Sequence, residues 1–335
     1  MPTFVWCTES VDTSAVQLAQ IMDAECTKQL TDEMDLATDN IIFYGNVPLP
    51  DGIKFNKKTM YNDPSIGAAI RAKKTFLEKL SGGNITTPKL VVIGEGATLN
   101  KAQQSLGVNG KIDMIEKGTM KVLATVDSAA QFNAYKQSSA YACKHVPATK
   151  KMRIFFGNPN ITGNCVIGAS CTEYRTLTFK ETLKMGRSAE VQAQVDNMFD
   201  TGMLTEGMGV GQTAWTEQSN YEFGNAALKP FFTDKMKTVI NTVYTAMNTL
   251  FSDIDFFAVD VSVEANGTVY LTNVTTSPSL QNIDILSFVS EYFKQLVNFG
   301  RVSLKKKLAG KIETLSLSRI KKVLELLDKE EEQAA

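Results

Sequence analysis

Three oxygen-bearing side chains near the end of the chain have the types and spacing to hold a cation. Two β-rich runs, 255–265 and 268–275, are joined through Asn266-Gly267, a pair that strongly favours a hairpin turn. If these two residues form the loop, Asp260 lies directly opposite Asn273, and opposed side chains in such a pair lie about 5 Å apart at Cβ. Thr275 then follows on the same face.

The same register makes further predictions about the hairpin. It pairs Ala265 with Thr268 and Val263 with Tyr270. Period two places these residues on one face: Ala258, Asp260, Ser262, Leu271, Asn273 and Thr275. Hard oxygen ligands on a rigid strand pair suit a Mg²⁺ ion that also binds substrate phosphates. The alternative is a hairpin whose polar face is simply solvated.

Composition restricts the chemistry that surrounds this hairpin. The chain has 335 residues, 43% hydrophobic residues, and 35 basic against 36 acidic residues, so no global charge favours nucleic acid. A single histidine, His145, excludes sites that need several imidazoles. Cys143 and His145 have the spacing to share a metal or to be ordinary neighbours on a strand or loop. Five cysteines without a C-x-x-C pair favour a reducing, cytoplasmic location, and no apolar stretch predicts a membrane partner.

Periodic apolar patterns predict both strands and helices along the chain. Apolar runs predict strands at 40–46, 88–94, 151–156 and 172–179. Asp63-Pro64 predicts the start of a helix that continues to Leu80. Further helices are expected after Ser188 and after Thr233, the second with a long apolar stripe from Met236 to Phe251 that indicates core packing.

Other segments carry weaker signals. The glycines between Gly94 and Gly110 match neither a P-loop nor a dinucleotide fingerprint, which favours ordinary turns. Residues 208–212 are expected to form a mobile loop. Residues 301–322 carry eight basic residues against the single acid Glu313, which indicates either a solvated helix face or a docking site for an acidic partner.

The hairpin resembles the end of the ATP-grasp fold, in which an Asp is followed after the turn by Glu-x-Asn and a small-residue Pro turn. Asp260 matches the Asp, Asn273 stands where Glu is expected, Thr275 stands where Asn is expected, and Ser277-Pro278 matches the turn. The strand Glu173-Tyr174-Arg175 is similar to one in small bacteriophage-encoded, RimK-like ATP-grasp proteins. The likeness extends in patches from about residue 40 to 285.

This resemblance implies an α+β protein with a three-part ATP-grasp fold. An N-terminal α/β lobe is expected over 1–88, a central subdomain over 89–168 and a C-terminal subdomain with the hairpin over 169–290. Residues 291–335 are expected to form a helical tail. The implied cofactors are ATP and Mg²⁺, with Asp260, Asn273 and Thr275 as metal ligands.

The resemblance also implies a reaction. A carboxylate would attack the γ-phosphate of ATP, and an amine or thiol would then displace phosphate from the acylphosphate. Arg175 would bind the acylphosphate, Glu173 would orient Arg175, and Lys151 and Lys184 are candidates for phosphate contact. The protein would act in the cytoplasm, of the host if it is phage-encoded.

A second hypothesis follows from the two substitutions in the metal motif. With Asn273 and Thr275 in place of Glu and Asn, the site has one carboxylate instead of two. The protein would then be a catalytically degenerate nucleotide-binding or scaffold protein. An active enzyme should instead recover a carboxylate from nearby, for example from Asp284 or Glu173.

Overall fold

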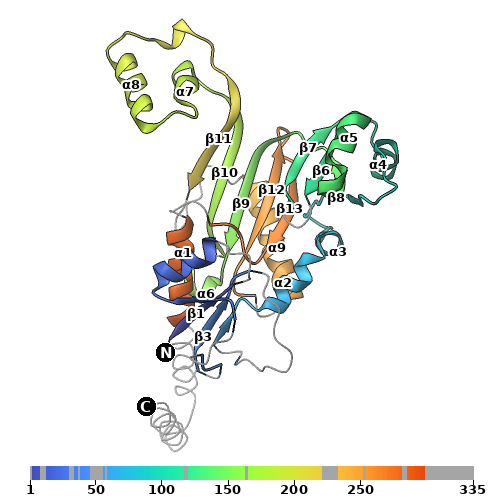
Figure 1. The fold of residues 1–335 in the computed structure, drawn as a ribbon, viewed down its shortest axis with the longest axis vertical. Coiled ribbons are helices and arrows are strands. Elements are labelled where there is room, and N and C mark those ends of the chain that lie inside the picture. Colours follow the sequence, from blue (N-terminus) through green and yellow to red (C-terminus); the bar gives the residue numbers. More distant parts are fainter. Residues whose placement is uncertain are drawn as a thin grey trace, which may run out of the picture.

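The computed structural model describes residues 2–7, 13–29, 34–36, 38–45, 56, 59–116, 120–162, 165–220, 233–251, 254–280 and 285–298. These residues form an α+β protein with three sheets (Figure 1). The predicted basic segment 301–322 and Asp284 lie outside the described residues.

The first sheet is parallel and belongs to the N-terminal lobe. Its strands run in the order β2-β1-β3-β4. They are β1 (Thr3–Trp6), β2 (Glu25–Thr27), β3 (Asn40–Phe43) and β4 (Met60–Tyr61), with helix α1 (Thr13–Met22) between β1 and β2. All four residues of β3 are buried, which confirms the strand predicted from the apolar run after Asn40.

Two short helices follow where one long helix was expected. Asp63 caps α2 (Pro64–Arg71) by accepting a hydrogen bond from the Ser65 amide. Ala72 then leaves the helical region with a ψ of 59°, and α3 (Lys73–Leu80) begins at the next residue. The helix predicted from 63 to 80 is therefore interrupted, and this interruption places Lys73 in the first turn of a separate helix beside β13.

The second sheet is formed by residues 90–144, a segment in which the sequence carries weak signals of secondary structure. Its order is β5-β8-β6-β7, and all its pairs are antiparallel. Its elements are β5 (Leu90–Val92), α4 (Leu99–Leu106), β6 (Ile112–Glu116), β7 (Val122–Val126), α5 (Ala129–Tyr135), η1 (Lys136–Ser138) and β8 (Ser139–Lys144). Gly107 ends α4 in the left-handed region, with φ 71°. This is an ordinary helix terminus, as the absence of a phosphate-loop motif indicated.

The third sheet is the largest, with five antiparallel strands in the order β11-β10-β9-β12-β13. They are β9 (Ala148–Phe156), β10 (Val166–Thr176), β11 (Thr213–Asn220), β12 (Phe257–Glu264) and β13 (Val269–Thr275). A short helix, α6 (Pro159–Thr162), joins β9 to β10. Since β9 pairs with both β10 and β12, this sheet begins earlier in the chain than the boundary predicted at 168/169.

Between β10 and β11 the chain forms a projecting arm. It contains α7 (Phe179–Lys184), α8 (Ala189–Asp200) and η2 (Glu206–Met208). Figure 1 shows this arm at the far end of the two long strands, away from the N-terminal lobe. Helix α8 begins directly after Ser188, as predicted, and the Ser188 side chain caps it. Residues predicted as one strand to Phe179 instead leave the sheet after Thr176, because Thr178 starts α7 with a capping box to Glu181.

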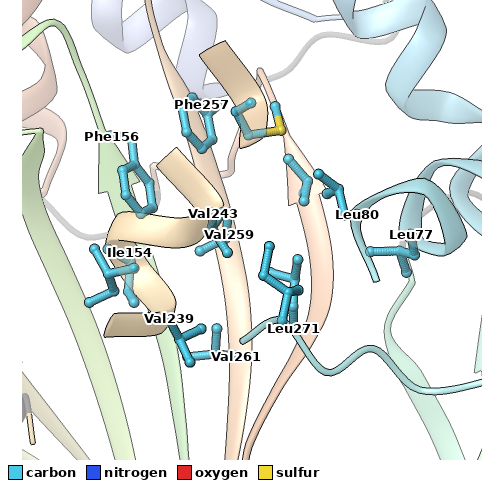
Figure 2. Close-up of a cluster of buried hydrophobic side chains, with 14 of the residues drawn as sticks. Leu77, Leu80, Ile154, Phe156, Val239, Val243, Phe257, Val259, Val261 and Leu271 are labelled. Carbon is cyan, nitrogen blue, oxygen red and sulfur yellow. The ribbon is translucent and has the colours of Figure 1, made fainter. Parts of the chain in front are cut away.

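Helix α9 (Asp234–Leu250) covers one face of the large sheet. Thr233 caps it by accepting from the Met236 amide at 3.2 Å, as the sequence predicts. Figure 2 shows Val239 and Val243 of α9 against Ile154, Phe156, Val259 and other side chains of the sheet. Most of the predicted stripe is therefore core, although Leu250 at its end is exposed. Phe156 and Phe257 of the sheet stack in the same buried cluster, with ring centroids 4.6 Å apart.

The opposite face is covered in part by the N-terminal lobe and by a helix over residues 285–298. This helix runs through the boundary predicted at 290/291 and contributes Leu286, Val289 and Phe293 to a buried cluster with Phe155 and Ala258 of the sheet. Tyr292 of the same helix donates to the Asp255 carbonyl at 2.6 Å and accepts from the Asn158 amide at 2.9 Å. Burial raises the pKa of this phenol far above its usual range, so the group remains a donor.

Asn62 joins the N-terminal lobe to the turn after β13. Its side-chain amide donates to the Phe43 and Thr276 carbonyls at 2.8 Å each, and its backbone amide donates to Asp255 at 2.8 Å. The residue is buried and has a φ of 62°, a conformation that asparagine adopts more readily than most residues. Asn62 therefore ties three segments that are distant in the sequence.

We expect Asn62→Ala to lower the free energy of unfolding by about 2–4 kcal/mol, because two buried carbonyls lose their donor and alanine is disfavoured at positive φ. Urea unfolding measures this change. Asn84→Ala, at an exposed turn, is the matched control and should change the value by less than about 0.5 kcal/mol. Equal effects of the two substitutions would contradict the junction role of Asn62.

Candidate functional site

The hairpin of β12 and β13 brings Asp260 opposite Asn273, as predicted. The turn itself differs from the prediction. The Glu264 amide donates to the Thr268 carbonyl at 2.9 Å, and the Gly267 amide donates to the Glu264 carbonyl at 2.9 Å. Gly267 has φ 79°, whereas Asn266 has no positive φ, so the loop has three residues rather than two.

A β-bulge at Thr272 compensates for this longer loop. Val261 pairs with Leu271 and Val263 with Val269, so the predicted pairs Val263–Tyr270 and Ala265–Thr268 are wrong. A shift of one residue moves side chains to the other face. Leu271 therefore lies in the apolar core with Val261, not beside Asp260. The prediction at Asp260 is correct because it lies beyond the bulge.

Asp260 forms a bidentate ion pair with Arg153 of β9. Arg153 Nε lies 2.7 Å from Asp260 Oδ1, and Nη2 lies 3.0 Å from Oδ2. The two residues are direct neighbours across the β9–β12 ladder. Burial opposes the charged form of Arg153, but the hydrogen bonds and charge of Asp260 outweigh it and raise the pKa of the guanidinium. This pair is the strongest electrostatic feature of the hairpin.

The two other predicted ligands lie beside the pair. Asn273 Nδ2 donates to Asp260 Oδ2 at 3.1 Å, and Asn273 Oδ1 is buried without a hydrogen-bond partner among the described residues. Thr275 Oγ1 accepts from the Ser277 amide at 3.1 Å. Thr275 thus shapes the closing turn, and Asn273 supplies one unpaired amide oxygen.

Lys73 approaches the hairpin from its outer edge. Its ammonium donates to the Val274 carbonyl. Burial lowers the pKa of Lys73 to about 8, while the negative charge of Asp260 acts in the opposite direction. At neutral pH most of the population therefore carries a second positive charge near Asp260, in addition to Arg153.

A cavity of about 1050 Å³ lies between the second sheet and strands β9, β10, β12 and β13 of the large sheet. The second sheet contributes apolar side chains, among them Leu90, Ile115 and Met120. The large sheet contributes polar side chains, and these include Lys151, Arg153, Thr172, Tyr174, Asp260 and Ser262. The cavity therefore combines apolar side chains, including bulky ones from the second sheet, with polar and charged side chains from both sheets.

A polar cluster lies on the second-sheet side of the cavity. Asp113 Oδ1 is 2.8 Å from His145 Nδ1 and accepts from Thr125 Oγ1 at 2.6 Å. Asp113 is buried, and all three residues line the cavity. Cys143 is close by, and burial, followed by the charge of Asp113, raises the pKa of its thiol to about 12. The described residues contain no group of three His, Cys, Asp or Glu side chains that could hold a metal.

Strand alternation separates the other predicted residues into two groups. Thr172 and Tyr174 of β10 face the cavity with Lys151, whereas Glu173 and Arg175 alternate with them. Glu173 forms an ion pair with Lys150 at 3.0 Å. The carboxylate that orients Arg175 is Glu181, at 2.6 and 2.9 Å, and not Glu173 as predicted.

Arg175, at the end of β10, therefore binds the arm through Glu181, and Lys184 is part of the arm. Arg153 pairs with Ser170 on β10, and Arg175 lies five positions further along that strand, about 16 Å away. Lys184 of α7 binds Asp196 of α8 at 2.7 Å. Of the four residues predicted for phosphate contact or catalysis, the structure brings only Lys151 into the cavity with Asp260.

The charges around Asp260 do not fit a magnesium ion held by the protein. Mg²⁺ requires near-octahedral oxygen ligands and usually one or two carboxylates with free charge. Here both oxygens of Asp260 bind Arg153, and Lys73 adds a second cation. Asn273 Oδ1 is the one unpaired oxygen of the cluster. The magnesium site thus stays a prediction, and we derive no chemistry through it.

Sequence reasoning missed Arg153 and Lys73. Arg153 was visible as a basic position in the alternating run 151–156, but only the pairing of β9 with β12 places it beside Asp260. Lys73 carries no local signal, because the break at Ala72 and the contact with Val274 depend on tertiary structure.

Glu181 should stabilise the arm in a pH-dependent way. Its hydrogen bonds with Arg175, followed by one from the Thr178 amide, lower its pKa to about 2. A lowered carboxyl pKa contributes stability that is full above the unfolded value of 4.5 and is lost as the pH falls toward 2.

We therefore expect Glu181→Gln to lower stability slightly at pH 7, because the pair is exposed to solvent, and the difference from the wild type to vanish near pH 2. Glutamine retains the capping hydrogen bond, so the change reports the ion pair. Thermal unfolding of both proteins from pH 2 to 7 measures it. A difference independent of pH would contradict the assignment.

No helix among the described residues is both long and apolar enough to span a membrane. The sequence matches no protein-family model, and it matches no curated protein.

Comparison with solved structures identifies the fold. D-alanyl-alanine synthetase A from Vibrio cholerae superposes with a TM-score of 0.55 at 14% identity, over 90% of this chain and 98% of that chain. D-alanine–D-alanine ligase from Bacillus anthracis, complexed with ATP, gives 0.55 at 9% identity over 91% and 98%. D-cycloserine synthetase DcsG gives 0.51 at 9% identity over 88% and 99%. At such low identity the likeness concerns the fold alone, and the chain has the α+β ATP-grasp fold expected from the hairpin.

Proposed function

We propose that the protein binds ATP in the cavity between its second and third sheets and acts as an ATP-dependent carboxylate ligase. One observation carries the proposal: the cavity brings apolar side chains together with the basic side chains of Lys151 and Arg153, in a chain with the ATP-grasp fold. A nucleotide needs both, an apolar surface for its base and cations for its phosphate chain. The Bacillus anthracis ligase of this fold was crystallised with ATP.

The residues have definable roles in this proposal. Leu90, Ile115 and Met120 would contact the base, and Tyr174 offers it a ring. Lys151 and Arg153 would bind phosphate oxygens. In the reaction a substrate carboxylate attacks the γ-phosphorus and ADP leaves. An amine or thiol then attacks the acyl carbon and phosphate leaves.

A second candidate is nucleotide binding without ligation. The observation that favours it is the Arg153–Asp260 pair, since the carboxylate that the resemblance assigns to the metal is already paired with a guanidinium. The kinship with phage-encoded RimK-like proteins, the cytoplasmic location and an acidic partner for 301–322 remain predictions.

Binding is tested first. We expect Lys151→Met to weaken ATP binding about five- to tenfold, the loss of one charge-assisted contact. Isothermal titration calorimetry measures it. Lys150→Met is the matched control, because Lys150 is the next residue of the same strand and pairs with Glu173 instead of lining the cavity. Equal loss in both variants, or no ATP binding by the wild type, would overturn the assignment of the cavity.

Turnover separates the two candidates. A ligase should release ADP faster when a carboxylate and an amine are both supplied, so a panel of amino acids and small carboxylates should contain at least one stimulating pair. An ADP-coupled assay, with mass spectrometry of the products, measures this. ATP binding with the same slow ADP release across the whole panel would favour the second candidate.

A further inference from the structure

The fold resemblance predicts ligands for Mg²⁺ around Asp260. The structure instead places positively charged side chains there. We define the Arg153 cluster as Arg153, Asp260, Asn273 and Lys73. The inference that follows rests on the proposed binding of a nucleotide in the cavity, and it concerns how the phosphates are held.

The charge count of the Arg153 cluster is positive. Asp260 is its one carboxylate, and Arg153 and Lys73 each carry a positive charge, so the sum is +1. Lys151, which lines the same cavity, adds another positive charge. A divalent cation placed on Asp260 would have to displace Arg153 and approach Lys73. An anion bound by the unused N–H donors of Arg153 displaces neither side chain and meets a net positive charge.

Arg153 retains capacity to bind an anion while it is paired. A guanidinium has five N–H donors, and Asp260 uses one on Nε and one on Nη2. Three donors therefore remain, and the side chain lines the cavity with 31% of its surface exposed. Asp260 acts here as a positioning residue, because its two oxygens fix the plane and direction of the guanidinium.

Lys73 contributes a positive charge to the cluster but would not contact a nucleotide in the cavity. Its ammonium binds the Val274 carbonyl on the outer edge of β13, and it is not part of the cavity wall. From this edge, the positive charge of Lys73 offsets the negative charge of Asp260. Asn273 Oδ1 is the one atom of the cluster that could serve as a ligand for a cation. A single amide oxygen binds a divalent cation only weakly, because Mg²⁺ needs several oxygen ligands.

We propose that Arg153, held by Asp260 and supported by the charge of Lys73, binds the nucleotide phosphates directly, so that this protein binds ATP without a divalent cation.

The wild-type protein tests this directly. ATP is titrated into the full chain by calorimetry, once with excess EDTA and once with excess MgCl₂. The proposal expects dissociation constants that agree within about threefold. Binding that is at least about tenfold weaker in EDTA would overturn it while leaving the proposed function intact. No binding in either buffer would overturn both.

Two variants add an independent test in EDTA. Arg153→Lys keeps the positive charge but lacks the planar, forked N–H donors of a guanidinium. We expect it to weaken ATP binding about tenfold or more. Arg175→Lys is the matched control on the arm and should stay within about twofold of the wild type. Wild-type affinity in Arg153→Lys would overturn the proposal, as would equal losses in both variants.

Asp260→Asn tests the opposite view. If Asp260 were a magnesium ligand, the wild type would bind ATP more tightly with Mg²⁺ than in EDTA, and the substitution would abolish that difference. The proposal expects the ratio of the two constants to be near one in both proteins. Because the ratio compares one protein with itself, a general loss of affinity does not affect it.

Discussion

The alternation of side chains along the five-stranded sheet is the constraint on which the rest of this molecule depends. In β9, Met152, Ile154 and Phe156 pack toward α9, so Lys151 and Arg153 must point to the other face. In β12 the same rule sends Val259 and Val261 to the core and Asp260 and Ser262 to the cavity. The apolar residues that stabilise the fold therefore also fix where the charges of the site lie.

The closing turn after β13 connects this sheet to the N-terminal lobe. Ser277 accepts from the Gly45 amide, the Pro278 carbonyl accepts from Tyr44, and the Thr276 carbonyl accepts from Asn62. The turn that the ATP-grasp resemblance singled out thus serves as a joint between lobes. The same strand, β13, carries Asn273 of the Arg153 cluster a few residues before this joint.

Local signals predicted the elements and much of one hairpin, and they failed where distant strands meet. The caps at Asp63 and Thr233, the start of α8 after Ser188 and the stripe of α9 were predicted correctly, because each depends on neighbouring residues. The Asp260–Asn273 pair was also predicted, although the bulge at Thr272 was not, so the outer pairs were wrong. The partner of Asp260 was unpredictable, because Arg153 is 107 residues away and reaches it only through sheet order. Arg175 and Glu173 were assigned to the site from a motif, but alternation and the start of α7 place them elsewhere.

The proposed binding mode brings the nucleotide phosphates to the guanidinium of Arg153 and not to a protein-bound metal at Asp260. The most direct measurement is a crystal structure of the full chain with a non-hydrolysable ATP analogue and Mn²⁺, with anomalous scattering used to locate the metal. The account predicts phosphate oxygens within hydrogen-bond distance of Arg153, the Arg153–Asp260 pair intact, and no anomalous peak at Asp260. A Mn²⁺ peak on Asp260 and Asn273, with Arg153 turned away, would contradict it.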